Sequence, residues 1–246
     1  MIRIILAVII VLLFFLVGLV TMPLTFLVSK FNKHAGDLMA LRLVQWIFKV
    51  ILFVAGTKAT YVGLENIPTD RPVMYIGNHR SIFDIILTYT KCLDLTGYIA
   101  KEEIGKILPL KAWMKRLYCI FLDRSNPKAG MKVILTAIDQ VKKGISMFVF
   151  PEGTRNKYAE IETDLLEFKD GSFRIAQKTG CPVLPVAMIN TAEIFENHKP
   201  TFKSAKVKVI YGEPIEYSLL TDEQKKHPGA FFQQVVKDML EKELNN

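Results

Sequence analysis

Cysteine and histidine are scarce in this 246-residue sequence, and both are scattered along it. The three cysteines, Cys92, Cys119 and Cys181, form no C-x-x-C pair. An odd number of distant cysteines supports neither a zinc ribbon nor a disulfide framework, and it favours a reducing compartment. His79 has no second histidine or cysteine close to it in sequence, so we expect no metal site there.

The sequence also lacks the pattern of a serine hydrolase and any flexible linker. No G-x-S-x-G occurs, and no cysteine lies beside a histidine, which argues against a protein nucleophile. No repeat, low-complexity segment or Gly- or Ser-rich linker interrupts the chain. We therefore expect one α/β domain with an N-terminal addition.

Acidic residues are outnumbered, since 32 Lys and Arg stand against 24 Asp and Glu and give a formal charge of +8. Such an excess favours anionic partners, namely phosphate groups, anionic lipid or nucleic acid. Composition does not choose among these three, so the choice depends on the order of the residues.

Charge is absent from residues 4–29, a run that is longer than the roughly 20 apolar residues that cross a bilayer. A cleaved signal peptide would have a shorter apolar region and a small-residue cleavage site. We expect a retained membrane segment; the alternatives are a cleaved signal, a buried core helix and, because of Pro23, a helix that enters the membrane and returns. Only Arg3 precedes the run, so a single span predicts the remaining domain on the cytoplasmic side of the cell membrane.

The next apolar stretch, Leu41–Thr57, carries a polar stripe of Arg42, Gln45 and Lys49 at helical spacing. This pattern is typical of a helix at a membrane interface, and equally of a helix docked on the protein's own core. In either case residues 1–57 are predicted to be membrane-anchoring helices, and residues 58–246 an α/β domain.

Beyond residue 58, short β-rich runs alternate with helical patterns, which predicts a mainly parallel central sheet flanked by helices. The predicted strands are Ala59–Val62, Val73–Gly77, Gly97–Ala100, Cys119–Leu122, Ser146–Phe150, Val183–Met188 and Lys206–Ile210. The predicted helices are Ile82–Thr90, Leu108–Leu117, Lys128–Lys143, Gly171–Lys178 and Asp222–Leu244. Ligands of such sheets bind beyond the carboxyl ends of the strands. The residues that follow four of these strands are Asn78, His79, Arg80, Lys101, Asp123, Arg124 and 151–155, and we expect one site there.

His79 and Asp84 are five positions apart, so on one continuous helix their side chains would point about 140° apart. Ser81 is a good N-cap, and with Asp84 it forms a capping-box pattern, which predicts that the helix starts at Ser81 and leaves His79 on a loop. One ring nitrogen would then donate to Asp84 while the other faces the pocket, as in general-base catalysis. Taken alone, the spacing also fits a turn histidine and a capping aspartate.

The segment Phe150–Arg155 follows a predicted strand and has the residues of an anion-binding turn. Gly153 permits a tight backbone turn that brings amides near an anion, and the Arg155 guanidinium suits bidentate phosphate contact. Arg124 and Lys101 add charge, although each also has an acidic neighbour in sequence. Lysines in residues 101–116 interleave with apolar residues, which suits the headgroup region of an anionic membrane. Without a nucleic-acid motif, we expect no nucleic acid as a partner.

Five blocks of the sequence match the motifs of one family. They are N-H-x-x-x-x-D at Asn78–Asp84, F-x-D-R at Phe121–Arg124, F-P-E-G-T-R at Phe150–Arg155, F-K-x-G-x-F at Phe168–Phe173 and an apolar run around proline at Val183–Val186. With them, residues 59–212 resemble the 1-acyl-sn-glycerol-3-phosphate (lysophosphatidic acid) acyltransferases of the glycerolipid acyltransferase superfamily. Tyr118 departs from the pattern, because these enzymes usually have glycine there.

The resemblance implies transfer of a fatty acyl group from acyl-CoA or acyl-carrier protein to the sn-2 hydroxyl of lysophosphatidic acid, giving phosphatidic acid for phospholipid synthesis. It implies that His79 takes the proton of that hydroxyl and that Asp84 holds the imidazole. The residues expected to hold the glycerol-phosphate end are Arg124, Glu152, Gly153 and Arg155, with Lys101 as our addition. Neither a metal nor an organic cofactor is expected.

Three other functions fit parts of the pattern. The same chemistry would serve another acceptor, such as glycerol-3-phosphate or another lysolipid. A membrane-bound hydrolase or thioesterase would need a protein nucleophile, for which the sequence has no motif. A non-catalytic lipid-binding adaptor would need only the basic, apolar face, and it would retain its activity without His79.

Overall fold

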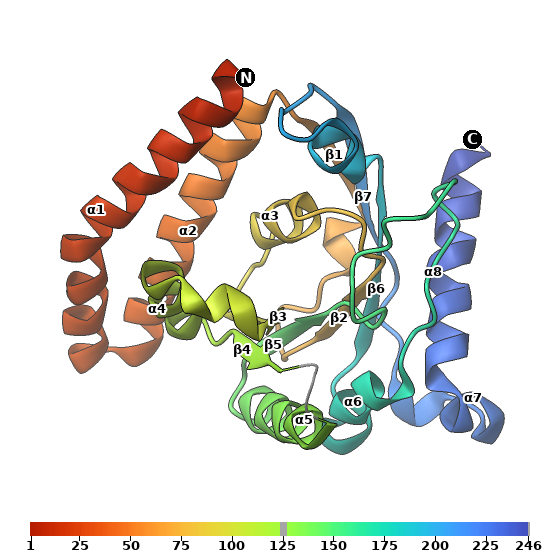
Figure 1. The fold of residues 1–246 in the computed structure, drawn as a ribbon. Coiled ribbons are helices and arrows are strands. Elements are labelled where there is room, and N and C mark those ends of the chain that lie inside the picture. The colour runs from red at the N-terminus through yellow and green to blue at the C-terminus, as the bar shows by residue number, and fades with distance from the viewer. Residues whose placement is uncertain (124–126, 246) are drawn as a thin grey trace.

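The seven predicted strands join one sheet in the computed structural model, which describes residues 1–123 and 127–245 (Figure 1). The strands are β1 (Lys58–Val62), β2 (Met74–Gly77), β3 (Thr96–Lys101), β4 (Ile120–Leu122), β5 (Ser146–Val149), β6 (Val183–Ile189) and β7 (Lys206–Tyr211). Their order across the sheet is β1-β7-β6-β2-β5-β3-β4, and neighbours are parallel except for the antiparallel pair β6 and β7. The predicted α/β fold with a mainly parallel sheet is confirmed.

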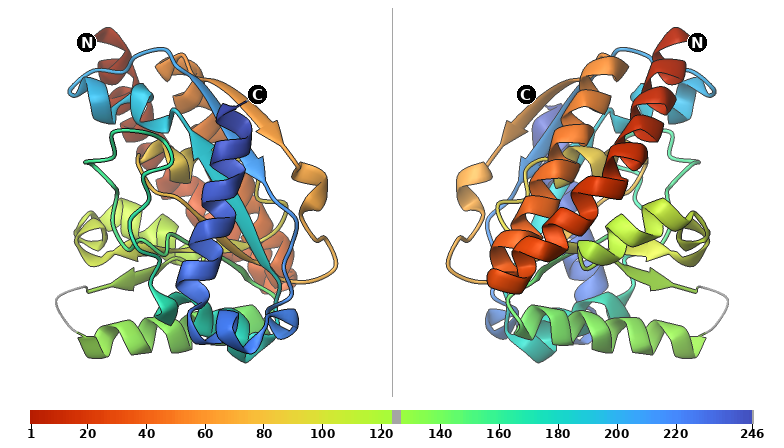
Figure 2. Two further views of the ribbon diagram at one scale, coloured as in Figure 1. Left: turned by 90° about the vertical axis from the view of Figure 1, so that its right-hand side faces the viewer. Right: turned by 90° about the vertical axis from the view of Figure 1, so that its left-hand side faces the viewer.

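Helices cover both faces of this sheet (Figure 2). The α-helices are α1 (Ile2–Phe31), α2 (Lys33–Ala55), α3 (Phe83–Tyr89), α4 (Leu108–Arg116), α5 (Pro127–Lys142), α6 (Arg174–Thr179), α7 (Asp222–Lys226) and α8 (Pro228–Leu244). The short 3-10 segments are η1 (Leu64–Asn66), η2 (Glu102–Lys106), η3 (Asp170–Phe173), η4 (Thr191–Ile194), η5 (Glu196–His198) and η6 (Tyr217–Leu219). The prediction of one helix over 222–244 was wrong. The helix is interrupted at His227, because Pro228 has no N–H to continue it, and α8 starts at Pro228.

The middle strands β2, β5 and β6 are buried along their whole length, which explains their unbroken apolar sequences. Side chains alternate between the two faces. Tyr75 and Phe148 pack on the face that α2 and α3 cover, while Met74 and Met147 pack against the core that includes α5, α6 and α8. The sheet therefore has an apolar core on each side.

The two N-terminal helices form an antiparallel hairpin that lies beside the sheet domain (Figures 1 and 2). α1 runs continuously through Pro23, and the Asn32 side chain caps α2 by accepting from the Ala35 N–H at 3.0 Å. Both helices are long and apolar enough to cross a membrane by length and composition, a test that a core helix or a signal sequence also passes. Only 11% of the most apolar window of α1 is buried, against 44% for α2.

Contacts with the domain run along the whole of α1. At its start the Arg3 guanidinium donates to the Ser204 hydroxyl at 2.7 Å, and in its middle the Phe14 ring lies 5.0 Å from the Trp113 ring between centroids. Near its end Thr25 Oγ1 accepts from Arg116 Nε at 3.1 Å. The hairpin thus lies flat along the domain.

Two of the three residues in the polar stripe of α2 contact the domain, while Lys49 is exposed. Gln45 is buried and donates to the carbonyls of Tyr89 and Cys92 at 3.0 and 2.8 Å, and Arg42 donates to the Leu93 carbonyl. This stretch is therefore docked on the protein's own core, as one of its two interpretations expects. Trp46, on α2, is 60% exposed.

Candidate active site

The site begins where two neighbouring parallel strands end. β2 and β5 pair with Ile76 opposite Val149, so the residues after both strands leave the sheet side by side. The His79 ring consequently stacks on the Phe150 ring, with centroids 4.0 Å apart and an interplanar angle of 18°. This pairing brings two sequence motifs that are about 70 residues apart into contact.

Close packing fixes the backbone just before His79. A Cβ on Gly77 would lie 2.9 Å from both the Met188 side chain and the Val186 carbonyl, so only glycine fits there. The Asn78 side chain donates to the Met188 carbonyl and accepts from its N–H, both at 2.8 Å. Asn78 therefore ties the His79 loop to β6, a role that sequence reasoning did not assign.

The structure brings His79 and Asp84 together as the spacing predicted. His79 Nδ1 lies 2.8 Å from Asp84 Oδ2, and the same oxygen accepts from the backbone N–H groups of Arg80 and Ser81 at 2.8 Å. The Asp84 side chain is fully buried, and that of His79 is 13% exposed. With Nδ1 donating to the carboxylate, the neutral imidazole presents Nε2 as a proton acceptor.

The predicted capping box was wrong in part. Helix α3 begins at Phe83, and the Ser81 hydroxyl accepts from the Phe83 N–H at 3.0 Å while it donates to the Glu196 carboxylate. The Asp84 carboxylate does accept from the Ser81 N–H, so only one half of the box forms. The Ser81 hydroxyl thus bonds Glu196 and the Phe83 N–H, and not the Asp84 N–H that a complete capping box requires.

Glu152 lies beneath the His79 loop and is only 3% exposed. Its carboxylate accepts from the N–H of His79 at 2.6 Å and from the N–H of Leu166 at 3.1 Å. Burial raises the pKa of Glu152 to about 7. These contacts hold the backbone of His79 in place, whereas the prediction had the Glu152 side chain at the substrate.

Gly153 adopts the left-handed conformation with φ of +72°, as the predicted tight turn requires. A Cβ there would lie 2.9 Å from the Lys169 amine, so the turn also brings this cation close to the backbone. Lys169 belongs to the fourth of the sequence blocks in chain order, but no role had been assigned to it. The sequence motifs did not predict this cation beside the Gly153 turn.

The other predicted cations are engaged to different degrees. Arg155, whose side chain is 36% exposed, pairs with Glu196 at 2.8 Å. Lys101 is about half exposed and pairs with Glu103 at 2.7 Å. Arg124 lies outside the described residues.

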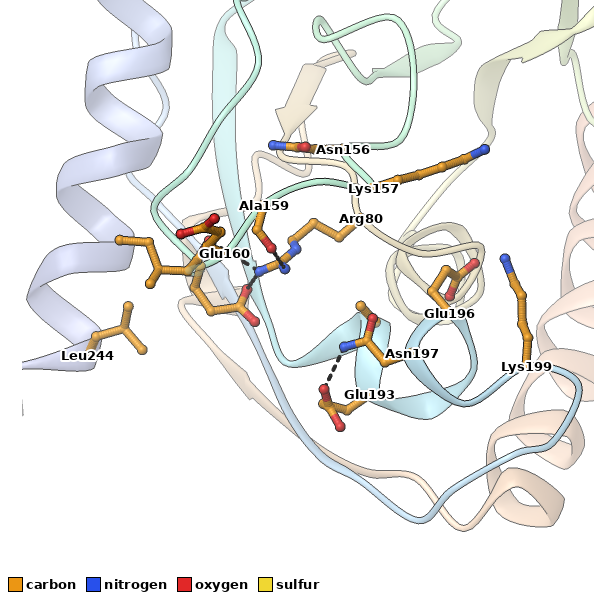
Figure 3. Close-up of a pocket in the computed structure, with 13 residues that line it drawn as sticks. Arg80, Asn156, Lys157, Ala159, Glu160, Glu193, Glu196, Asn197, Lys199 and Leu244 are labelled. Atoms are coloured by element: carbon orange, nitrogen blue, oxygen red, sulfur yellow. Dashed lines mark hydrogen bonds and ion pairs between the residues drawn. The ribbon is translucent and has the colours of Figure 1, made fainter.

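Beside this centre, a surface hollow of about 520 Å³ opens between the loop after β5 and the segment after β6 (Figure 3). Arg80 crosses its floor, where it donates to the Ala159 carbonyl at 3.0 Å and pairs with Glu162 at 3.1 Å. Glu193 and Glu196 line the hollow, and His79 is not among its described lining residues. Across the described residues 1–123 and 127–245, no group of three or more His, Cys, Asp or Glu side chains could hold a metal ion.

Known proteins are similar to this chain in sequence and in fold. A family model described as Acyltransferase matches residues 58–189. A chloroplastic 1-acyl-sn-glycerol-3-phosphate acyltransferase of Brassica napus is 36% identical over 172 residues, 68% of this chain and 48% of the relative. The 1-acyl-sn-glycerol-3-phosphate acyltransferase of Borreliella burgdorferi is 30% identical over 198 residues, 80% of this chain and 75% of the relative.

A solved structure agrees with the fold over nearly the whole length. The crystal structure of the 1-acyl-sn-glycerophosphate (LPA) acyltransferase PlsC from Thermotoga maritima has a TM-score of 0.75 and 26% identity, and the match covers 97% of each chain. The chain spans about half the length of the Brassica relative and three quarters of the Borreliella one. Because the family model covers more than half of the chain, this protein belongs to the acyltransferase family.

Proposed function

We propose that this protein transfers a fatty acyl group from a thioester donor to the sn-2 hydroxyl of 1-acyl-sn-glycerol-3-phosphate and so makes phosphatidic acid. The observation that carries the proposal is the hydrogen bond of 2.8 Å between His79 Nδ1 and a buried Asp84 oxygen, beside the loop that bears Arg155. The names of the relatives from Brassica and Borreliella, and of the Thermotoga structure, support the same acceptor.

The chemistry needs one base and no protein nucleophile. The sn-2 oxygen forms a bond to the thioester carbonyl carbon while its proton passes to Nε2 of His79. The tetrahedral intermediate then breaks its C–S bond, and the departing thiolate takes the proton back from the imidazolium. Asp84 holds the ring and stabilises its charged form. The products are phosphatidic acid and the free thiol of coenzyme A or of acyl-carrier protein.

Cationic and backbone groups beside the base would bind the phosphate end of the acceptor. Arg155 supplies a planar fork, and the Gly153 turn supplies backbone amides. Arg124 and Lys101 belong to the same proposal as further cations. For Glu152 the contacts support a supporting role under His79, since a buried carboxylate on two backbone N–H groups does not attract phosphate.

We also propose that residues 1–57 anchor the protein in the plane of one membrane leaflet and that residues 58–246 carry out the transfer on the cytoplasmic side. The exposed apolar face of α1 supports this, as does its contact with the domain at Arg3, Phe14 and Thr25, because a helix so held cannot leave the domain to cross the bilayer. The three free cysteines fit a cytoplasmic domain.

Flotation with vesicles of mixed phosphatidylcholine and phosphatidylglycerol tests this docking. Leu16→Asp, on the exposed face of α1, should reduce the vesicle-bound fraction several-fold because a charge must then enter the apolar layer. Leu219→Asp, at a leucine on η6 that is 82% exposed against 62% for Leu16, should have no effect. Equal loss of binding in both variants would contradict the proposal.

Labelled-acyl transfer by the purified protein tests the reaction. Lysophosphatidic acid, glycerol-3-phosphate, lysophosphatidylcholine and monoacylglycerol are offered in turn, each with acyl-CoA and with acyl-carrier protein. The proposal expects turnover with lysophosphatidic acid above that with the other acceptors. Preference for glycerol-3-phosphate or another lysolipid would keep the chemistry and change the acceptor, while release of free fatty acid in place of transfer would indicate a thioesterase.

A further inference from the structure

Glu196 stands at the site although no sequence motif includes it. It opens the 3-10 segment η5, and its side chain is only 9% exposed. Its carboxylate accepts from three donors, namely the Ser81 hydroxyl, the Ile82 N–H at 3.1 Å and Arg155 Nη1 at 2.8 Å. A buried carboxylate with three donors is held firmly in one position.

These three donors come from the two halves of the candidate site. Ser81 and Ile82 immediately precede α3, whose first turn carries Asp84 and through it orients His79. Arg155 comes from the loop after β5, the loop expected to bind the phosphate. Glu196 is therefore the link between the base and the phosphate-binding arginine.

The contact leaves part of Arg155 open. A guanidinium has five N–H donors, and the contact with Glu196 is made through Nη1. The side chain as a whole is 36% exposed, and the contact with Glu196 uses one of the three guanidinium nitrogens. An arginine held at one end and open at the other is prepared for a second anion.

We propose that Glu196 is a positioning residue for the acceptor, because its carboxylate holds the Arg155 guanidinium against the N-terminal end of α3 at a fixed offset from His79. This inference rests on the proposed function, since it assumes that Arg155 binds the phosphate of the acyl acceptor. Without Glu196 the long Arg155 side chain would lose its fixed orientation. The entropic cost of ordering it would then reduce the free energy of acceptor binding.

Two variants separate position from charge. Glu196→Ala removes every contact, and we expect the KM for lysophosphatidic acid to rise about tenfold, the size of one charge-assisted hydrogen bond, while kcat changes less than about threefold. Glu196→Gln removes the charge but keeps an oxygen for Arg155 and Ile82, and its amide donates to the Ser81 hydroxyl. We expect its KM to stay within about threefold of the wild-type value.

Glu193→Gln is the matched control. Glu193 lies three residues earlier beside the same hollow, and it bonds Asn197 and His198 but not Arg155 (Figure 3). The control should keep the wild-type KM. Thermal unfolding without ligand reports whether each variant folds, and if Glu196→Ala does not fold, Ser81→Ala removes one anchor of the carboxylate and should raise the KM by about threefold.

Three results would overturn the inference. They are an unchanged KM in Glu196→Ala, an equal rise in Glu193→Gln, and a lower KM in both Glu196 variants, which would mean that the carboxylate competes with phosphate for Arg155. If the wild type transfers no acyl group to lysophosphatidic acid, the proposed function fails, and thermal stabilisation by glycerol-3-phosphate then judges Glu196. Stabilisation that is kept in Glu196→Gln and lost in Glu196→Ala supports the inference, and no stabilisation of the wild type refutes it.

Discussion

Two buried aspartates, Asp37 at the hairpin junction and Asp84 at the candidate site, are surrounded by different donors. The Asp37 carboxylate pairs with the Arg116 guanidinium and the Lys33 amine and also accepts from the Tyr118 hydroxyl. Asp84 is 0% exposed, yet no Lys or Arg side chain of the described residues pairs with it. Its donors are the His79 ring and two backbone N–H groups.

The difference fits a structural carboxylate at Asp37 and, under the proposed function, a carboxylate at Asp84 that takes part in the reaction. At Asp37 the negative charge is compensated permanently, and both carboxylate oxygens have partners. At Asp84 one oxygen takes no hydrogen bond from any described residue, and a full compensating charge arises only when His79 becomes protonated. A buried anion whose counter-charge appears during the reaction favours the protonated base.

Removal of the His79 imidazole takes away the side-chain partner of Asp84 and should have the largest effect, a loss of acyl transfer. We expect His79→Ala to lower acyl transfer to lysophosphatidic acid by about a thousandfold, the range of a general base. His198→Ala is the matched control. Like His79, His198 contacts a carboxylate, Glu193 at 2.9 Å, but this pair is more exposed than that of His79 and Asp84. Rates of labelled-acyl transfer measure both variants, and full activity of His79→Ala would disprove the base.

Removal of the Asp37 side chain should lower the stability of the fold and leave the rate of acyl transfer unchanged. Asp37→Ala leaves the Arg116 cation buried without a counter-charge, and we expect it to lower the free energy of unfolding by about 3 kcal/mol. Denaturant unfolding in detergent measures the loss. Asp139→Ala, which breaks an exposed pair with Lys143, is the control and should cost less than about 1 kcal/mol. Equal losses would mean that burial at the junction has no importance.

Glu152 sharpens the comparison as a buried carboxylate whose hydrogen bonds come from backbone N–H groups. Because its pKa rises from 4.5 to about 7 on folding, the folded state holds the proton more tightly than the unfolded chain. Stability from this group is thus present at low pH and is lost as pH rises through about 7. Relative to Glu152→Gln, the wild type should lose about 3 kcal/mol of unfolding free energy between about pH 4.5 and pH 7, the window set by the two pKa values. A difference that is constant with pH would contradict the raised pKa.

Substitution of Tyr118 should have the smallest effect on stability, because it removes one neutral donor from the Asp37 carboxylate, which already pairs with two cations. Its hydroxyl contacts Asp37 and Lys33 while its backbone has φ of +61°. Tyr118→Phe should lower the free energy of unfolding by about 1 kcal/mol and leave acyl transfer unchanged. In the Asp37→Ala background the same substitution should have less effect, which denaturant unfolding of the double variant measures. Full additivity would show that the hydroxyl acts elsewhere.

Local signals predicted the strands and the contact between His79 and Asp84 well. Val73–Gly77 differs from observed β2 by one residue, and the five-residue spacing of His79 and Asp84 gave their contact once a loop was placed before the helix. These features depend on neighbours in sequence, such as an unbroken apolar run or an interrupted helix. Pattern reading is strong where the interacting groups lie within one turn or strand.

Long-range contacts account for what the sequence could not supply. Ser81 and Glu196 are 115 residues apart, and no spacing rule predicts that an acid from that distance would take the serine hydroxyl. Glu152 was expected at the substrate because it sits in a phosphate-type motif, but strand pairing turns it beneath His79. The antiparallel direction of β7 depends in the same way on the path of the chain after β6.

The stacking of His79 on Phe150 bears on the order of events in the proposed reaction. The stacking on one ring face and the hydrogen bond from Nδ1 to Asp84 hold the imidazole in one orientation, so that Nε2 stays the nitrogen that faces away from Asp84. The proton accepted from the alcohol must then be returned to the sulfur by the same atom. Because the proposed reaction passes through no covalent acyl-enzyme, donor and acceptor have to occupy the site together, and initial-rate kinetics should show the intersecting lines of a ternary complex in place of the parallel lines of a covalent shuttle.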